Sequence, residues 1–264
     1  MSEYHSKNKE TETRASIVAL LMKMWTETAQ KRLDSIQGRP TLAPVIEAAG
    51  IAVWAVFCVA FAQRGLSGPA PGTVVILVTA LLGIAVADFM SGVIHWFFDT
   101  FLEESTPIVG PQFVAPFREH HRDPLAMTRH GFLELNGNNC LASLPLNLSV
   151  WWYAPVEPES VAGVAAYLFL VTFSFTLTAT NQLHSWAHQP VRPLLARWLQ
   201  RCGLAISPAH HARHHTPPHN MSYCVTNGWL NSLTDRFRFF VHAERVLVRL
   251  GVPRRLSGSH TSRT

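Results

Sequence analysis

The segment VVILVTALLGIAVADFMSGVIHWFFDTFL, residues 74–102, decides the fold of this chain. Its first half has no charged residue, whereas its second half carries Asp88, His95 and Asp99. From Gly72 onward the stretch is compatible with one helix, and about 30 residues at about 1.5 Å each reach about 45 Å. That length exceeds the hydrocarbon core of a bilayer, about 30 Å. We therefore predict a membrane-spanning helix whose far end projects into water.

Three further stretches are apolar enough to suggest membrane spans. Residues 44–63 are apolar apart from Glu47, and residues 161–180 form a second strong candidate. Residues 141–153 are a weaker one, because the stretch is short and contains Pro145. It either spans the membrane or forms half of a re-entrant pair with the stretch that follows. The pattern predicts an all-α, integral-membrane bundle of about four transmembrane helices.

The segments on either side of this bundle are polar or basic. Residues 1–16 have no apolar core, so they are not a secretory signal peptide. An amphipathic pattern over residues 17–36 predicts an interfacial helix or, equally, a helix on the soluble side. We divide the chain into a polar tail with this helix (1–43), a membrane-embedded domain (44–240) and a basic C-terminal tail (241–264).

Composition supports a chain that is partly solvated by lipid. Of the 264 residues, 48% are hydrophobic and only 15% are charged. The net charge of +5 comes from basic residues beside the membrane candidates, which favours attraction to anionic lipid head groups over nucleic-acid binding. The four cysteines are far apart and form no C-x-x-C pair, so neither a zinc ribbon nor a disulfide framework is indicated.

The distribution of Lys and Arg predicts the orientation of the bundle. Only Arg64 lies between the first two spans, and residues 154–160 contain no basic residue. The N-terminal flank, residues 103–140 and the end of the chain are richer in basic residues, and such segments stay in the cytosol. Both termini and every histidine cluster are then cytosolic, at an inner membrane in a bacterium or at the endoplasmic reticulum in a eukaryote.

The 14 histidines are the dominant chemical signal, because most of them fall into a few short clusters. On the long second helix, Asp88, His95 and Asp99 share one face. His184 and His188 are one helical turn apart, so their imidazoles can converge on one site. The clusters in chain order are His95, His120-His121 with His130, His184-Ser-Trp-Ala-His188, and His210-His211-Ala-Arg-His214-His215 with His219.

So many histidines on separate stretches imply two metal ions. A structural zinc needs four ligands and usually includes cysteine, whereas imidazole also suits iron and copper. An all-histidine site of this size on membrane helices fits two iron ions that activate O₂, which would act as co-substrate. There is no H-E-x-x-H motif for a zinc protease and no G-x-S-x-G motif for a lipase. The pattern therefore predicts a cytosolic, histidine-rich di-iron cap on the bundle.

These motifs resemble the Kua, or plasmanylethanolamine desaturase, family, whose bacterial members are called CarF-like. The resemblance spans roughly residues 85–240. It is carried by the segments Asp88-Phe-Met-Ser-Gly-Val-Ile-His95-Trp, Phe117-Arg-Glu-His-His-Arg-Asp-Pro124, Thr128-Arg-His130, Asn138-Asn-Cys140, Asn181-Gln-Leu-His-Ser-Trp-Ala-His188, His210-His-Ala-Arg-His-His215 and Gly228-Trp-Leu-Asn231.

The resemblance implies that residues 44–240 form a lipid desaturase domain that introduces the vinyl-ether double bond of plasmalogens. His210 and His130 stand beside the family's motifs and are kept as additional ligand candidates. The iron ligands that the resemblance implies are His95, His120, His121, His184, His188, His211, His214 and His215.

Other polar residues near the histidines receive supporting roles. Asp88, Asp99, Asn181 and Glu119 could orient imidazoles through the ring nitrogen that does not face the metal. Three cytosolic arginines could contact the phosphate of a lipid head group: Arg118, Arg122 and Arg213. No flavin, nicotinamide or Cys₄ iron-sulfur pattern is present. We therefore expect a separate electron donor, either a ferredoxin or a cytochrome b5-like protein.

Two alternatives remain open. The same di-iron centre could desaturate or hydroxylate another lipid, such as a fatty acyl phosphatidylglycerol or a sphingolipid, because histidine spacing does not distinguish these reactions. A metal-binding membrane scaffold or transporter is a non-enzyme alternative. It would place its ligands along a pathway inside the bilayer, whereas these clusters lie outside the apolar stretches.

Overall fold

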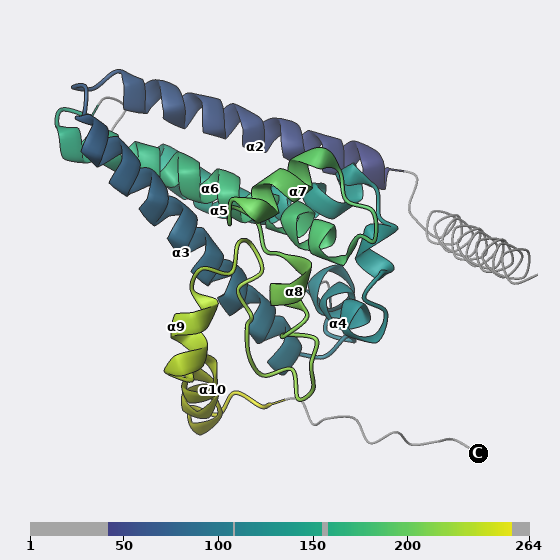
Figure 1. Cartoon of the computed structure of the whole chain (residues 1–264). Helices are drawn as coiled ribbons and strands as arrows, with labels where there is room; N and C mark the ends of the chain where they lie inside the picture. The colour runs from purple at the N-terminus through teal and green to yellow at the C-terminus, as the bar shows by residue number, and fades with distance from the viewer. Residues whose placement is uncertain (1–41, 108, 155–157, 255–264) are drawn as a thin grey trace, which may run out of the picture. The chain divides into compact units, whose positions relative to one another are not determined.

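The computed structural model describes residues 42–107, 109–154 and 158–254, and the described part of the chain is all α-helical (Figure 1). The described residues from Pro44 onward form one compact unit. The predicted interfacial helix over residues 17–36 lies outside the described residues. The helices are α2 (Ala43–Leu66), α3 (Thr73–Thr100), α4 (Ala115–Arg122), α5 (Phe132–Tyr153), α6 (Val161–His188), α7 (Leu194–Arg201), α8 (Pro208–His211), α9 (Asn231–Arg236) and α10 (Phe239–Arg249).

Three of the described helices are long and apolar enough to cross a membrane: α2, with 24 residues, and α3 and α6, with 28 each. At about 1.5 Å per residue, α3 and α6 reach about 42 Å, so part of each extends beyond a hydrocarbon core of about 30 Å. Large apolar side chains on α2 and α3 are exposed in the unit, including Val56, Leu77 and Leu82. The predicted all-α membrane bundle is confirmed, and three such helices are those of a multi-pass membrane protein.

The third predicted span is longer than expected. α5 is one helix from Phe132 to Tyr153, so it starts nine residues before the predicted position 141 and continues through Pro145. Pro145 has no backbone N–H to donate to the carbonyl of Leu141, so the helix continues with one intrahelical hydrogen bond missing. α5 packs against α6, and it is not among the three helices of membrane-spanning hydropathy.

The two longest helices, α3 and α6, form the most extensive pair in the unit. Gly83 allows their close approach, because a Cβ atom there would lie 3.0–3.1 Å from Thr172 and from the backbone of Phe169 and Phe173. Small residues at helix contacts are the usual means by which membrane helices approach one another. The pairing brings the last turns of α3 and α6 together at one end of the bundle.

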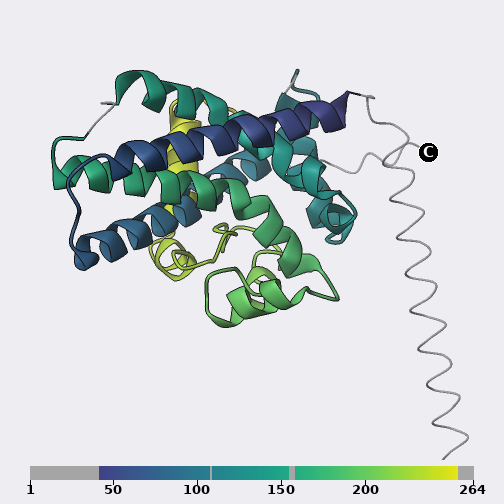
Figure 2. The same ribbon diagram turned by 90° about the horizontal axis from the view of Figure 1, so that it is seen from above.

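The short helices gather at that same end. Figures 1 and 2 show α4, α7 and α8 beside the ends of α3 and α6, away from the turn that joins α2 to α3. α10 packs against α3 through Phe240, which joins a core cluster with Trp96, Phe101 and Tyr223. The helix continues to Arg249.

Candidate metal centre

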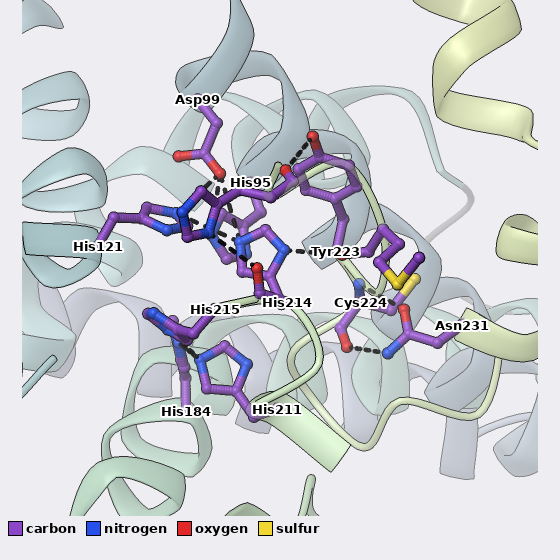
Figure 3. A network of polar contacts seen from close by, with 12 residues as sticks. His95, Asp99, His121, His184, His211, His214, His215, Tyr223, Cys224 and Asn231 are labelled. Carbon is purple, nitrogen blue, oxygen red and sulfur yellow. Dashed lines mark hydrogen bonds and ion pairs between the residues drawn. The ribbon is translucent and has the colours of Figure 1, made fainter. Parts of the chain in front are cut away.

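Five histidines from separate parts of the chain form a first group at this end of the bundle. Figure 3 labels His184, His211 and His215 of this group. One ring nitrogen from each lies within 4.8 Å of all the others. α6 supplies two of them on one face because they are four residues apart. The five are His120 on α4, His184 and His188 on α6, His211 on α8, and His215 just after α8.

The distances between these nitrogens match the edges of a metal coordination polyhedron. The Nε2 atom of His211 lies 2.8 Å from that of His184, and 2.9 Å from those of His188 and His215. A ring nitrogen has either one N–H or one lone pair, so it cannot bond to three imidazoles at once. Ligand nitrogens about 2.1 Å from one metal ion are separated by about 3.0–3.4 Å. The arrangement therefore suits lone pairs that point at one cation.

A second group lies beside the first and includes a carboxylate: His95, Asp99, His121 and His214. The Oδ2 atom of Asp99 is 3.1 Å from the Nε2 of His121, 3.4 Å from that of His95 and 3.5 Å from that of His214. The sequence interpretation gave Asp99 an orienting role through the far ring nitrogen. In the structure its oxygen faces the Nε2 atoms themselves, in the position of a fourth ligand.

Neighbouring histidines in the sequence divide between the two groups. His120 belongs to the first group and His121 to the second, although their rings are only 4.4 Å apart. His214 and His215 divide in the same way, into the second and the first group respectively. The two groups are therefore adjacent, which is the arrangement of a site for two metal ions.

Three histidines of the first group lie outside the long helices and have a lowered pKa. Burial lowers the pKa of His120, His211 and His215, that of His215 to about 3, and the neighbouring histidines lower each pKa further. A neutral imidazole keeps the lone pair that a metal ion needs. The Nε2 atom of His120 is buried with no hydrogen-bond partner among the described residues, as a ligand atom would be without its metal.

Local structure orients the histidines of the last cluster. Ser207 caps α8, because its hydroxyl accepts a hydrogen bond from the His210 backbone at 3.2 Å, and Pro208 occupies the first helical position. The Nδ1 atom of His214 lies 2.8 Å from the Met221 carbonyl oxygen. Donation of that N–H to the carbonyl leaves the Nε2 lone pair of His214 in the second group.

Asp88 does not contact an imidazole but holds the chain that follows the histidines. Its carboxylate is fully buried and accepts backbone N–H bonds from Asn227, Gly228 and Leu230 at 3.0, 2.9 and 3.1 Å. Gly228 has a φ of +76°, and a Cβ atom there would lie 2.7 Å from the ring of His210. Asp88 therefore ties to α3 the 227–230 loop, whose Gly228 lies against the ring of His210.

Three other predicted residues lie outside both groups. His210 contacts the side-chain amide of Asn231 at 3.3 Å, and His130 pairs with Glu134 at 2.9 Å. Asn181 donates to the Leu135 carbonyl and to the Asn139 side chain, both at 3.1 Å, and so joins α6 to α5. The structure gives all three of them structural contacts.

The three arginines that could bind a head group have protein partners. Arg118 is buried and donates to the carbonyls of Phe101 and Leu102, at 2.9 and 2.7 Å. Arg122 pairs with Glu104 at 3.4 Å, on the surface. The remaining one, Arg213, lies 3.9 Å from Asp235.

Tyr223 is a neighbour of the site that the sequence pattern does not reveal. Its ring lies 4.9 Å from that of His214 and 5.9 Å from that of His95, and its hydroxyl donates to the His219 carbonyl at 2.9 Å. Burial raises the pKa of the Tyr223 hydroxyl, which stays protonated. No motif marks this tyrosine, because its position depends on a loop that returns from α8 to α3.

Comparison with known proteins agrees with this geometry. Residues 84–255 match the lipid desaturase domain family, and the match includes every residue of the two groups. The chain is 42% identical to plasmanylethanolamine desaturase from Myxococcus xanthus over 212 residues, which cover 80% of this chain and 74% of that protein. It is 40% identical to mouse plasmanylethanolamine desaturase 1 over 66% of each chain.

A more distant relative is the chloroplastic fatty acid desaturase 4 of Arabidopsis thaliana, with 37% identity over 64% of this chain and 51% of that protein. No solved structure matches the chain. The predicted resemblance to the plasmanylethanolamine desaturase family is confirmed. The family match covers more than half of the chain and contains both histidine groups, so this protein belongs to the lipid desaturase family.

Proposed function

We propose that this protein is an O₂-dependent plasmanylethanolamine desaturase that introduces the vinyl-ether double bond into an alkyl ether phospholipid. The observation that carries the proposal is the pair of adjacent ligand groups at the ends of α3 and α6, in a chain 42% identical to a plasmanylethanolamine desaturase. The reaction removes one hydrogen from each of the first two carbons of the ether-linked chain and reduces O₂ to water with two external electrons.

The donor set fits two iron ions. Imidazole and carboxylate ligands together are typical of non-haem iron, and no cysteine belongs to either group. His120, His184, His188, His211 and His215 would hold one ion, and His95, Asp99, His121 and His214 the other. When bound, the irons would supply the activation of O₂ that an unreactive alkyl chain requires.

The protein contributes position and the exclusion of water. His95, His211 and His214 are at most 1% exposed, so bulk water does not reach their ligand atoms. Asp99 brings one negative charge to the second group, which makes the two sites electrostatically different. Alkyl C–H bonds offer the protein no polar handle, so the site must act by holding the chain beside the metals.

Orientation and electron supply form part of the proposal. With the positive-inside rule, both termini and the histidine groups lie in the cytosol, where a ferredoxin or a cytochrome b5-like protein can deliver electrons. Exposed arginines on this end of the molecule, such as Arg197 and Arg201 on α7, would attract an acidic donor.

Desaturation of an acyl chain is the second candidate, supported by the 37% identity to a fatty acid desaturase. Hydroxylation at the same centre would differ only in how the substrate radical is resolved. The transporter hypothesis is disfavoured, because the ligand groups gather at one end of the bundle and do not follow a path along it.

The test is expression in membranes of cells that lack plasmalogens, with an alkylglycerol precursor supplied. Vinyl-ether lipids are measured by mass spectrometry, through their lability to acid. We expect product with the unchanged protein, none with His214→Ala or His215→Ala, and normal product with His130→Ala, whose ring lies outside both groups.

Absence of vinyl ether, with iron bound and a working electron donor present, would refute the ether substrate. Analysis of acyl chains in the same extract then distinguishes the second candidate: a new acyl double bond supports the acyl desaturase, and a hydroxyl group supports the hydroxylase.

A further inference from the structure

A cavity lies beside the second ligand group. It has a volume of about 230 Å³ and is lined by residues from the loop after α8, from α9 and from the start of α10. Its lining residues are Asn220, Met221, Thr234, Asp235, Arg238, Phe240 and Val241. Four of these side chains are polar or charged, which is unlike a tunnel for an alkyl chain.

The cavity is one residue layer from the second ligand group. The carbonyl of Met221, which lines it, contacts the His214 ring at 2.8 Å. Phe240, on another wall, packs against Tyr223 at 4.9 Å, and Tyr223 packs against His214 at the same ring separation. A ligand in the cavity would therefore lie close to the metals but would not touch them.

The segment that carries two of the lining residues, Arg238 and Phe240, also packs against α3. The ring of Phe239, the residue after Arg238, lies 5.2 Å from that of Phe89, in the middle of α3. Figure 1 shows α9 and α10 beside this part of α3. Phe89 follows Asp88, the first charged residue of α3, so α10 begins beside the point where the uncharged first half of α3 ends.

The lining presents one charge of each sign. Within the described part of the chain the Arg238 side chain has no hydrogen-bond or ion-pair partner, so its guanidinium is available to an anion. Asp235 accepts two hydrogen bonds from Ser222, both at 2.9 Å, and lies 3.9 Å from the Arg213 guanidinium, which is beyond hydrogen-bond distance. A carboxylate has about four acceptor sites. Asp235 therefore keeps acceptor capacity for a cation.

We propose that this cavity binds the zwitterionic phosphoethanolamine head group of the lipid substrate, with Arg238 on the phosphodiester and Asp235 on the ammonium. The proposal rests on the proposed function and names the part of the substrate that it left open. It assigns the phosphate to Arg238 and not to the arginines that the sequence pattern favoured, because Arg118, Arg122 and Arg213 have protein partners.

The geometry of the substrate requires a head-group site close to the carbon that is oxidised. In an alkyl ether phospholipid about six bonds separate the first alkyl carbon from the phosphorus, a span of about 8 Å when extended. An enzyme that oxidises that carbon must therefore hold the phosphate within this distance of the carbon, which itself lies beside the metals. A desaturase that acts in the middle of an acyl chain has no such constraint, so a head-group cavity beside the second ligand group favours the ether substrate.

The test is a binding titration that does not depend on turnover. Dihexanoyl phosphatidylethanolamine, a soluble ester lipid with no ether chain to desaturate, is titrated by calorimetry into the full-length, iron-loaded protein in neutral detergent. We expect Arg238→Gln to weaken binding at least about tenfold, as for the loss of a charge-assisted hydrogen bond. Arg236→Gln is the matched control, because Arg236 is exposed on α9 and does not line the cavity.

Two further ligands test the chemistry. The choline analogue has no ammonium N–H donor, so it should bind at least about tenfold more weakly than the ethanolamine lipid. Inorganic phosphate should not compete at equal concentration. Equal binding of the two lipids would overturn the role of Asp235, and equal competition by phosphate would identify a free-anion site in place of a head-group site.

Failure of this proposal is distinct from failure of the proposed function. If Arg238→Gln and Arg236→Gln bind the lipid equally, with unchanged iron content, the cavity is not the head-group site, whatever the activity. If the unchanged protein binds the ethanolamine lipid as expected but forms no vinyl ether, the cavity assignment holds and the reaction is wrong. In turnover, Arg238→Gln should raise KM and leave kcat within about twofold.

Discussion

Replacement of Asp88 by alanine tests how the fold holds the histidine segment. The Asp88 carboxylate is the buried acceptor of three backbone N–H groups in the 227–230 loop, at 2.9–3.1 Å. The Asp88→Ala variant leaves those three donors buried without a partner. Each unsatisfied buried donor costs about 1–3 kcal/mol, so the loop loses about 3–9 kcal/mol of stability relative to an opened state.

Hydrogen exchange measured by mass spectrometry reports this loss directly. A change of about 1.4 kcal/mol is tenfold in an equilibrium constant, so protection of the 222–231 amides should fall at least about hundredfold. Asp88→Asn keeps one acceptor oxygen and should lose less protection. Glu104→Gln is the control, because its surface pair with Arg122 is worth at most about 1 kcal/mol. Unchanged protection in Asp88→Ala would refute the assignment of Asp88 as the anchor of this loop.

Three further predictions concern the metal groups and the helix pairing. Asp99→Leu should lower the bound iron from about two ions per chain to about one, because the second group loses its carboxylate. Plasma mass spectrometry measures the iron content, and an unchanged content would exclude Asp99 as a ligand. His211→Ala should remove the iron ion of the first group, because the Nε2 atom of His211 is close to the Nε2 atoms of three partners. The iron that remains in the His211→Ala variant should then give a Mössbauer spectrum different from that of the iron in Asp99→Leu. Identical spectra would contradict two distinct sites. Gly83→Val should destabilise the α3–α6 pair by about 1–3 kcal/mol, because Phe169 and Thr172 fill the space beside Gly83. A detergent unfolding titration measures this change, and a change below about 0.5 kcal/mol would show that the helices can separate freely.

Much of the helical framework could be predicted from the sequence, because the length of an apolar segment and the helical spacing of its residues are local properties of the chain. The apolar run over residues 74–102 predicted a helix that continues beyond the membrane, and α3 carries His95 and Asp99 in its last two turns. The period of 3.6 residues also predicted that His184 and His188 share a face of α6. The start of α5 was missed by nine residues, because polar residues such as Asn136 and Asn139 concealed a helix that is held by contacts with α6.

The partition of the histidines could not be predicted, because it depends on the approach of segments far apart in the chain. His120 and His121 are adjacent in the sequence, yet they belong to different groups, because the last turn of α4 contacts His95 on α3 and His184 on α6. The Asp99 oxygen meets His121 and His214 only after α4 and the segment after α8 fold onto α3.

The sequence by itself determined that this protein is a helical membrane enzyme with histidines for two metals, because composition, helical period and motif spacing do not depend on the packing. Only the tertiary structure decided which of those histidines meet, that Asp99 joins them, that Asp88 holds a loop, and that Arg238 borders a cavity near the second group. The reason is that a ligand geometry of about 3 Å is set by the packing of α3, α4, α6 and α8 together, and no local pattern encodes that packing.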